Sequence, residues 1–199
     1  MGKDKDKEKI KLTLERVAAT AGILALLFTI YIEMDLFDDS PRNSDKFFGI
    51  WASEYSYSVN GGVATVEGTT EYFKTGMYNF KGKMNINTLT DNQDSIKVSY
   101  DLDGTGTWLN DSENLYITLT NSKSNPTSLQ VNQSLFDLSE PKFMDLIPPL
   151  ESFIPLNITG RYSIVSNENE VTSLEVNGPL GNKLSISMKK VDVTYQRVK

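Results

Sequence analysis

Alternating apolar and polar residues recur in run after run beyond Trp51, and this period of two constrains the fold more than any other feature of the chain. In the run 96–102, for example, the even positions are apolar and the odd positions are polar. Turn sequences such as 60–62, Asn-Gly-Gly, separate neighbouring runs. Strands are expected over 51–59, 63–73, 78–86, 96–102, 104–109, 115–120, 158–165, 171–176 and 184–195. The sequence therefore predicts a mainly β domain, an antiparallel barrel or sandwich of about eight to nine strands.

The stretch from Ser122 to Leu156 interrupts the strand pattern. It loses the period of two and contains prolines, which central strands exclude, at 126, 141, 148, 149 and 155. Within it, 141–147 predicts a short helix. Its apolar side chains either close one end of the barrel or form a surface for a partner protein. For the second role, the predicted partner-binding residues are Phe143, Ile147, Leu150 and Phe153.

An uncharged apolar run, Val17 to Ile32, precedes the β-patterned part. As a helix it spans about 24 Å, and its apolar neighbours extend it toward the roughly 30 Å of a bilayer core. A cleaved signal peptide is the alternative. However, the run is followed by residues such as Glu33 and Asp35 instead of a small-residue cleavage site. The sequence therefore predicts one uncleaved transmembrane helix over 17–37.

Basic residues are unevenly distributed about this helix. Five lysines and Arg16 precede it, whereas only Arg42 and Lys46 follow it closely. The positive-inside rule then predicts a cytoplasmic tail over 1–16, a linker over 38–46 and an extracytoplasmic barrel domain over 47–199. The chain has no cysteine, so no disulfide framework is expected. We predict a bacterial inner-membrane protein with a periplasmic or extracellular domain.

Catalytic chemistry has little support in the sequence. The chain contains neither histidine nor cysteine, which removes a Ser-His-Asp triad, a thiol nucleophile and the usual zinc ligands. Glu67 and Glu71 lie among threonines typical of an exposed strand face, and the acidic turns 91–94 and 101–104 lack the spacing of a calcium loop. The net charge of −6 argues against a nucleic-acid partner. We therefore predict a protein that is not an enzyme and uses no cofactor or metal.

Aromatic side chains dominate the predicted inner face of the sheet. A closed barrel of about eight strands has an interior that side chains fill or that holds one small ligand, and both alternatives stay open. Tyrosine and tryptophan supply flat faces with polar tips, which suit an amphipathic molecule. The predicted ligand-binding residues are Trp51, Tyr55, Tyr57, Tyr78, Phe80 and Tyr100, with Trp108 or Tyr116 expected beside them.

Two resemblances refine this prediction. The tripeptide Gly49-Ile50-Trp51 at the start of the first strand is similar to the first signature of lipocalin-like barrels, in which the tryptophan packs beside an arginine of a late strand. That resemblance implies Arg161 or Arg197 as the neighbour of Trp51. The layout of the chain also resembles the ToxS and VtrC type of bacterial inner-membrane co-regulator, in particular over 106–108 and 115–118.

The second resemblance implies a binding role without catalysis. Its members pair with a membrane-bound transcription regulator and in some cases form a bile-salt pocket with it. The expected partners are accordingly a membrane protein, the lipid bilayer and a small amphipathic ligand. Two other classes stay open: a cyclic-nucleotide-gated membrane β-barrel effector of anti-phage defence, and a structural subunit of an envelope complex.

Overall fold

A computed structural model describes residues 45–59, 61–138, 140, 147, 149–153, 156–177 and 183–191 of the chain. The predicted tail, transmembrane helix and most of the linker lie outside the described residues, as do Phe143, Arg197 and nearly all of the predicted helix over 141–147. Within the described part of the chain, no helix has the length and apolar character needed to cross a membrane.

The described residues form one antiparallel sheet and two short 3-10 helices. The strands are β1 (Gly49–Val59), β2 (Gly62–Tyr72), β3 (Met77–Leu89), β4 (Ser95–Asn110), β5 (Asn114–Val131), β6 (Ser134–Phe136), β7 (Thr159–Glu168), β8 (Val171–Asn177) and β9 (Lys183–Val191). The 3-10 helices are η2 (Asp45–Phe47) and η3 (Leu150–Phe153).

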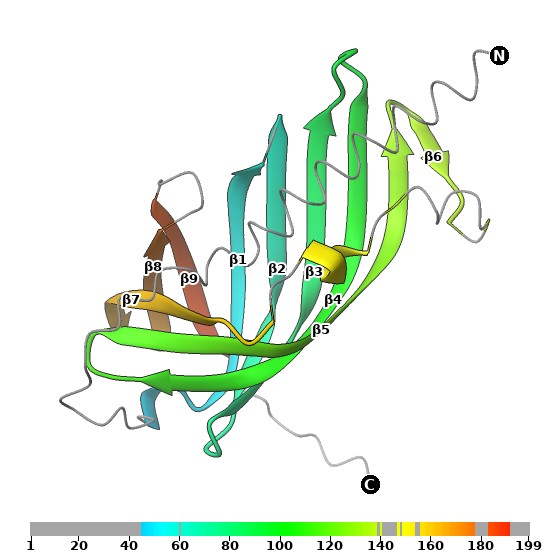
Figure 1. The fold of residues 1–199 in the computed structure, drawn as a ribbon. Helices are drawn as coiled ribbons and strands as arrows, with labels where there is room; N and C mark the ends of the chain where they lie inside the picture. The colour runs from blue at the N-terminus through cyan, green and yellow to red at the C-terminus, as the bar shows by residue number, and fades with distance from the viewer. Residues whose placement is uncertain are drawn as a thin grey trace, which may run out of the picture.

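The sheet closes into a ring. Its strand order is β4-β3-β2-β1-β9-β8-β7-β5-β6, and β4 also pairs with β5. Every strand except β6 therefore has a neighbour on both sides, and β6 lies outside the ring on the edge of β5 (Figure 1). The predicted mainly β, antiparallel architecture of eight to nine strands is confirmed.

The ring is complete at one end only. β1 pairs with β9 over Ile50–Glu54, and β5 pairs with β7 over Asn114–Thr118. Beyond these short pairings, β1 to β5 continue as an open, curved sheet that rises past β7, β8 and β9 (Figure 1). The fold thus combines a closed end with an open, concave sheet.

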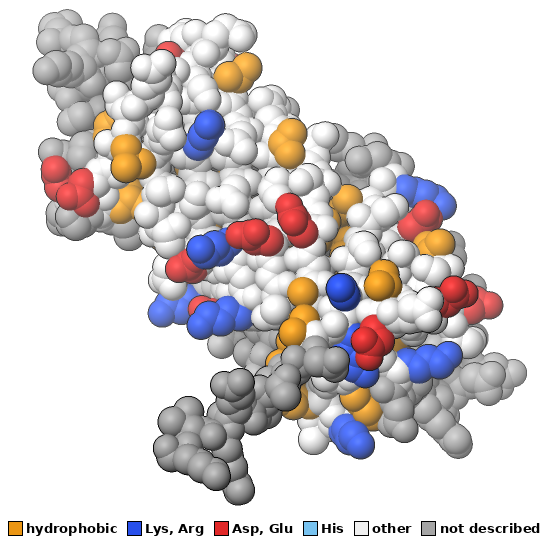
Figure 2. All heavy atoms as spheres, turned by 180° about the vertical axis from the view of Figure 1, so that it is seen from behind, with side chains coloured by type: hydrophobic (Ala, Val, Ile, Leu, Met, Phe, Trp, Pro, Cys, Tyr) orange, Lys and Arg blue, Asp and Glu red, His pale blue; other side chains and the backbone are white. Residues whose placement is uncertain are grey.

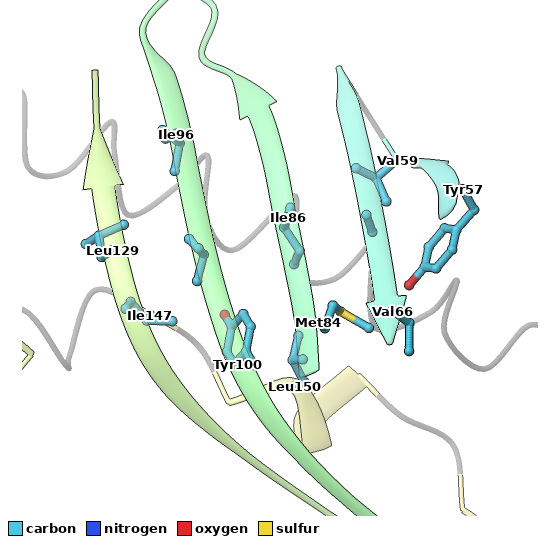
Figure 3. Close-up of a cluster of buried hydrophobic side chains, with 12 residues drawn as sticks. Tyr57, Val59, Val66, Met84, Ile86, Ile96, Tyr100, Leu129, Ile147 and Leu150 are labelled. Atoms are coloured by element: carbon cyan, nitrogen blue, oxygen red, sulfur yellow. The ribbon is translucent and has the colours of Figure 1, made fainter. Parts of the chain in front are cut away.

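Each half of the fold has its own core. The ring cluster fills the closed end and consists of Phe47, Trp51, Tyr72, Tyr78, Trp108, Leu115, Leu174, Val176, Ile186 and Met188. The sheet cluster lies on the concave side of the open half (Figure 3) and consists of Tyr57, Val59, Ala64, Val66, Met84, Ile86, Ile96, Val98, Tyr100, Leu129, Ile147 and Leu150. Both clusters use the inward positions of the alternating pattern, which is why the period of two predicted the faces of the strands.

The outer face of the open half is polar. Figure 2 shows acidic and basic side chains next to one another on this face. The strand register explains the arrangement, since Lys83 on β3 lies between Glu67 on β2 and Asp101 on β4. Opposite charges at paired positions of neighbouring strands stabilise a sheet modestly. Glu67 is therefore placed as an exposed strand residue.

Two strands are longer than the sequence pattern predicts. The runs 96–102 and 104–109 are parts of the single strand β4, and β5 continues to Val131. The prediction that the chain leaves the sheet at Ser122 is wrong because β5 accommodates Pro126 at an irregularity. The register pairs Ser99 with Ser128 and Tyr100 with Pro126, so that Thr127 is skipped. A bulge of this kind tolerates a residue that cannot donate a ladder hydrogen bond.

Aromatic packing holds the closed end together. The indole Nε1 of Trp51 donates a hydrogen bond to the backbone oxygen of Phe47 at 2.8 Å. The Phe47 ring lies about 6 Å, centroid to centroid, from the rings of Trp51, Tyr72 and Trp108. Both groups of the Trp51–Phe47 hydrogen bond are buried inside this cluster, so the bond fixes η2 against the closed end of the sheet.

Among the described residues, the basic neighbour of Trp51 is a lysine. The Nζ atom of Lys190 lies 5.9 Å from the centre of the Trp51 ring. Arg161 instead donates a hydrogen bond from Nε to Asn114 Oδ1 at 2.9 Å and is exposed. Of the two expected neighbours of Trp51, Arg161 is therefore excluded, and Arg197 lies outside the described residues. Since Tyr162 faces the interior, the neighbouring Arg161 faces outward.

Candidate ligand-binding cavity

A cavity of about 170 Å³ lies where the ring cluster and the sheet cluster meet. Its wall is mostly apolar and is built by strands on both sides of the ring together with Leu150 of η3. Two methionines, Met84 on β3 and Met188 on β9, line opposite parts of the sheet around it. The interior is thus neither wholly packed nor widely hollow, and it leaves a partly open cavity where the two clusters meet.

The predicted ligand-binding residues divide into two groups. Tyr55, Tyr78 and Phe80 line the cavity. Trp51 is buried in the ring cluster, and Tyr57 and Tyr100 are buried in the sheet cluster, so these three serve the core. Of the two further candidates, Trp108 is buried in the ring cluster, whereas the hydroxyl of Tyr116 donates to Asp111 at 2.9 Å. That any of the six contacts a ligand stays a prediction.

Sequence reasoning missed two tyrosines of the cavity wall, Tyr72 on β2 and Tyr162 on β7. A signal for both was present. Tyr72 shares its parity with Ala64 and Val66, both buried, and Tyr162 shares its parity with Ile164. Extending the alternation to the ends of these strands would have placed both tyrosines on the inner face.

Burial sets the electrostatics of the cavity. It raises the pKa of the Tyr55 hydroxyl to about 12, because the phenolate would lose its hydration. Burial also raises the pKa of Tyr72, Tyr78 and Tyr162 well above the ordinary value. Nearby tyrosines raise the pKa of Tyr72 and Tyr162 further. All four hydroxyls are therefore protonated and neutral at physiological pH.

Glycines shape one wall of the cavity beside Phe80. Gly68 on β2 pairs directly with Gly82 on β3. A Cβ atom on Gly68 would lie 2.8 Å from Phe80 Cε2, and one on Gly82 would lie 2.7 Å from Phe80 Cζ. The Phe80 ring therefore lies against bare backbone of two strands, an arrangement by which an aromatic ring covers glycines in a sheet. Any side chain at either glycine would push this ring.

Hydrogen bonds attach η3 to the sheet. The carboxylate of Glu151 accepts from the Ser124 hydroxyl at 2.7 Å and from the Ser124 backbone N–H. The Leu150 backbone N–H donates to the same hydroxyl oxygen at 3.1 Å. These bonds, here named the η3 clamp, hold Leu150 fully buried at the cavity wall.

Two of the predicted partner-binding residues lie in the core beside the η3 clamp. Ile147 and Leu150 are buried in the sheet cluster (Figure 3), which favours the alternative that this stretch closes the interior. Phe143 lies outside the described residues, and so does the side chain of Phe153. A partner contact through Ile147 or Leu150 would require that these side chains leave the core.

The chemistry available in the cavity is limited to apolar contact and hydrogen bonding. No lysine or arginine lines it, and the one carboxylate residue in its described wall, Asp103, is exposed and pairs across the strands with Lys81. Among the described residues, no group of acidic side chains could hold a metal ion. The arrangement suits the binding of a small molecule better than its conversion.

No protein-family model and no curated protein matches the chain. The function is therefore inferred from the sequence and from the geometry of the cavity.

Proposed function

We propose that this protein is a non-enzymatic, membrane-anchored binding protein whose barrel holds a small amphipathic ligand. The observation that carries the proposal is the cavity of about 170 Å³, lined by apolar side chains and tyrosines at the junction of the two clusters. A fully packed barrel would need no such space, because protein interiors normally leave few voids larger than a water molecule.

The dimensions and chemistry of the cavity support this class over a nucleotide-gated effector. An apolar cavity of about 150 Å³ binds benzene, whereas pockets for larger ligands measure roughly 300 Å³ or more. A cyclic nucleotide also carries a phosphate, which proteins commonly bind with arginine or lysine. The described wall of this cavity offers neither residue.

The membrane anchor and the partner protein are part of the proposal on the evidence of the sequence. The apolar run over 17–37 supports a single-pass anchor with an extracytoplasmic barrel, and the resemblance to ToxS and VtrC supports a membrane-bound partner such as a transcription regulator. Ile147 and Leu150 are buried, so among the predicted contact residues the partner contact is proposed for Phe143 and Phe153.

Toluene binding to the full-length protein tests the proposal. We expect toluene to raise the thermal unfolding midpoint of the wild type, since a ligand that binds only the folded state stabilises it. The variant Leu119→Phe adds a ring at the cavity wall and should remove this shift. Leu89→Phe, on the exposed end of β3, should leave it unchanged. Equal shifts in all three proteins, or none, would contradict ligand binding in the cavity.

A further inference from the structure

We infer that the ligand is an uncharged molecule with the bulk of about one six-membered ring, and that its hydrogen-bonding group meets a set of converging tyrosine hydroxyls. This inference rests on the proposed function and specifies which ligands the cavity accepts. It depends on the placement of the tyrosines, on the charges around the cavity and on its volume.

Four tyrosines from four strands converge on the cavity. Tyr55, Tyr72, Tyr78 and Tyr162, here named the tyrosine quartet, come from β1, β2, β3 and β7. The rings of Tyr72 and Tyr78 lie 6.3 Å apart, and Tyr162 interacts electrostatically with each of the other three. The four tyrosines share the wall of the cavity, and their hydroxyls are its most numerous side-chain hydrogen-bonding groups of one kind.

The quartet offers neutral hydrogen-bonding groups. Each phenolic hydroxyl has one proton to donate and lone pairs that accept. A hydroxyl that already bonds to a neighbour in the protein therefore keeps capacity for a ligand. A hydroxyl or carbonyl group of the ligand matches this chemistry, because it exchanges hydrogen bonds with water for hydrogen bonds with the quartet.

A charged ligand finds no buried counter-ion in the described wall, where the one carboxylate, that of Asp103, is exposed to water. The other polar residues of the wall are small and neutral, such as Ser53, Thr70 and Ser122. The exposed Asp103 lies opposite Lys81 in the strand register. An ion that enters an apolar cavity without an opposite charge loses its hydration and gains too little in return. Anions and cations of the same size are therefore expected to bind less well than neutral molecules.

Four probes with one ring each separate these requirements. Toluene has no hydrogen-bonding group, phenol has a neutral one, benzoate is an anion and benzylammonium is a cation. With the full-length protein at pH 7, calorimetry should show that phenol binds about threefold to tenfold more tightly than toluene, which is the contribution of one hydrogen bond. Benzoate and benzylammonium should each bind about tenfold or more weakly than phenol.

Tyrosine-to-phenylalanine variants locate the hydrogen bond. The double variant Tyr55→Phe, Tyr162→Phe should bind toluene as the wild type does and lose most of the preference for phenol. Tyr57→Phe is the matched control, because Tyr57 lies two residues from Tyr55 on the same strand face and stacks on its ring at 6.3 Å, but is buried in the sheet cluster and does not line the cavity. If the double variant fails to bind toluene, the two single variants replace it.

The binding results test this inference separately from the proposed function on which it rests. Tight binding of benzoate or benzylammonium, or a phenol preference that survives in the quartet variants, would overturn the inference and leave the cavity as a binding site. Failure of all four probes to bind the wild type would overturn both.

Discussion

At the scale of single residues, the buried tyrosines make stability depend on alkaline pH. A hydroxyl whose pKa is higher in the folded than in the unfolded protein stabilises the fold below its ordinary pKa of about 10. That contribution is lost as the pH rises from 10 through the folded value, which is about 12 for Tyr55. The chain has no histidine, the side chain whose ordinary pKa lies between 5 and 8.

We therefore predict a urea midpoint that changes little between about pH 6 and 9 and falls above about pH 10. Lysines also titrate in the alkaline range, so the informative quantity is the difference between the wild type and Tyr55→Phe. The variant should lose less stability between pH 10 and 12, by on the order of 2 kcal/mol in free energy of unfolding. Parallel curves for the two proteins would show that Tyr55 is not desolvated in the fold.

At the scale of elements, η3 depends on the η3 clamp for its position. Glu151→Ala removes both hydrogen bonds that Ser124 donates to the carboxylate. Because hydrogen bonds to charged groups contribute about 1.5–3 kcal/mol, we predict that the free energy of unfolding falls by about that amount. Glu168→Ala on β7, an exposed glutamate, should change it by less than about 0.5 kcal/mol.

A double-mutant cycle isolates the clamp from other effects of the substitution. Ser124→Ala together with Glu151→Ala should cost less than the sum of the two single variants, since the pair shares the same hydrogen bonds. Additive losses in urea titrations would mean that Ser124 and Glu151 do not act together, and that the packing of Leu150 alone fixes η3.

The elements also show where sequence patterns succeed and fail. The alternation predicted the faces of β1 to β3 because one face of each strand is buried and the other meets water. It failed over 122–131 because Pro126 was taken as the end of the sheet, whereas a bulge opposite Tyr100 absorbs it. The parity of Ile164 indicates that Tyr162 faces inward, but no local feature distinguishes a cavity wall from a packed core.

At the scale of the whole molecule, an antiparallel sheet of about eight to nine strands was predictable, but its closure and the size of the space inside were not. Strand number and spacing fit a barrel or a sandwich, and only the pairing of β4 with β5 closes the ring. The cavity depends on which side chains from distant strands meet, and on glycines such as Gly68 and Gly82 that make room for Phe80. Such contacts join residues far apart in sequence, so the period of two carries no information about them.

The placement of the whole domain follows from the basic flank of the apolar run and is testable in intact cells. We predict that protease added to spheroplasts cleaves the chain within the linker over 38–46, because the positive-inside rule puts the barrel outside the cytoplasm. Protection of the linker in spheroplasts, with cleavage after lysis, would reverse this orientation. A cytoplasmic effector would then become the better proposal.

The central claim is that a small neutral ligand enters the cavity, and methionine methyl NMR tests it most directly. Met84 and Met188 line the cavity, whereas Met77 at the start of β3 is exposed and lies away from it. With the methionine methyl groups labelled in the full-length protein, phenol should shift the signals of Met84 and Met188 through its ring current and leave that of Met77 in place. A shift of the Met77 signal alone, or unchanged Met84 and Met188 signals at saturating phenol, would contradict the account.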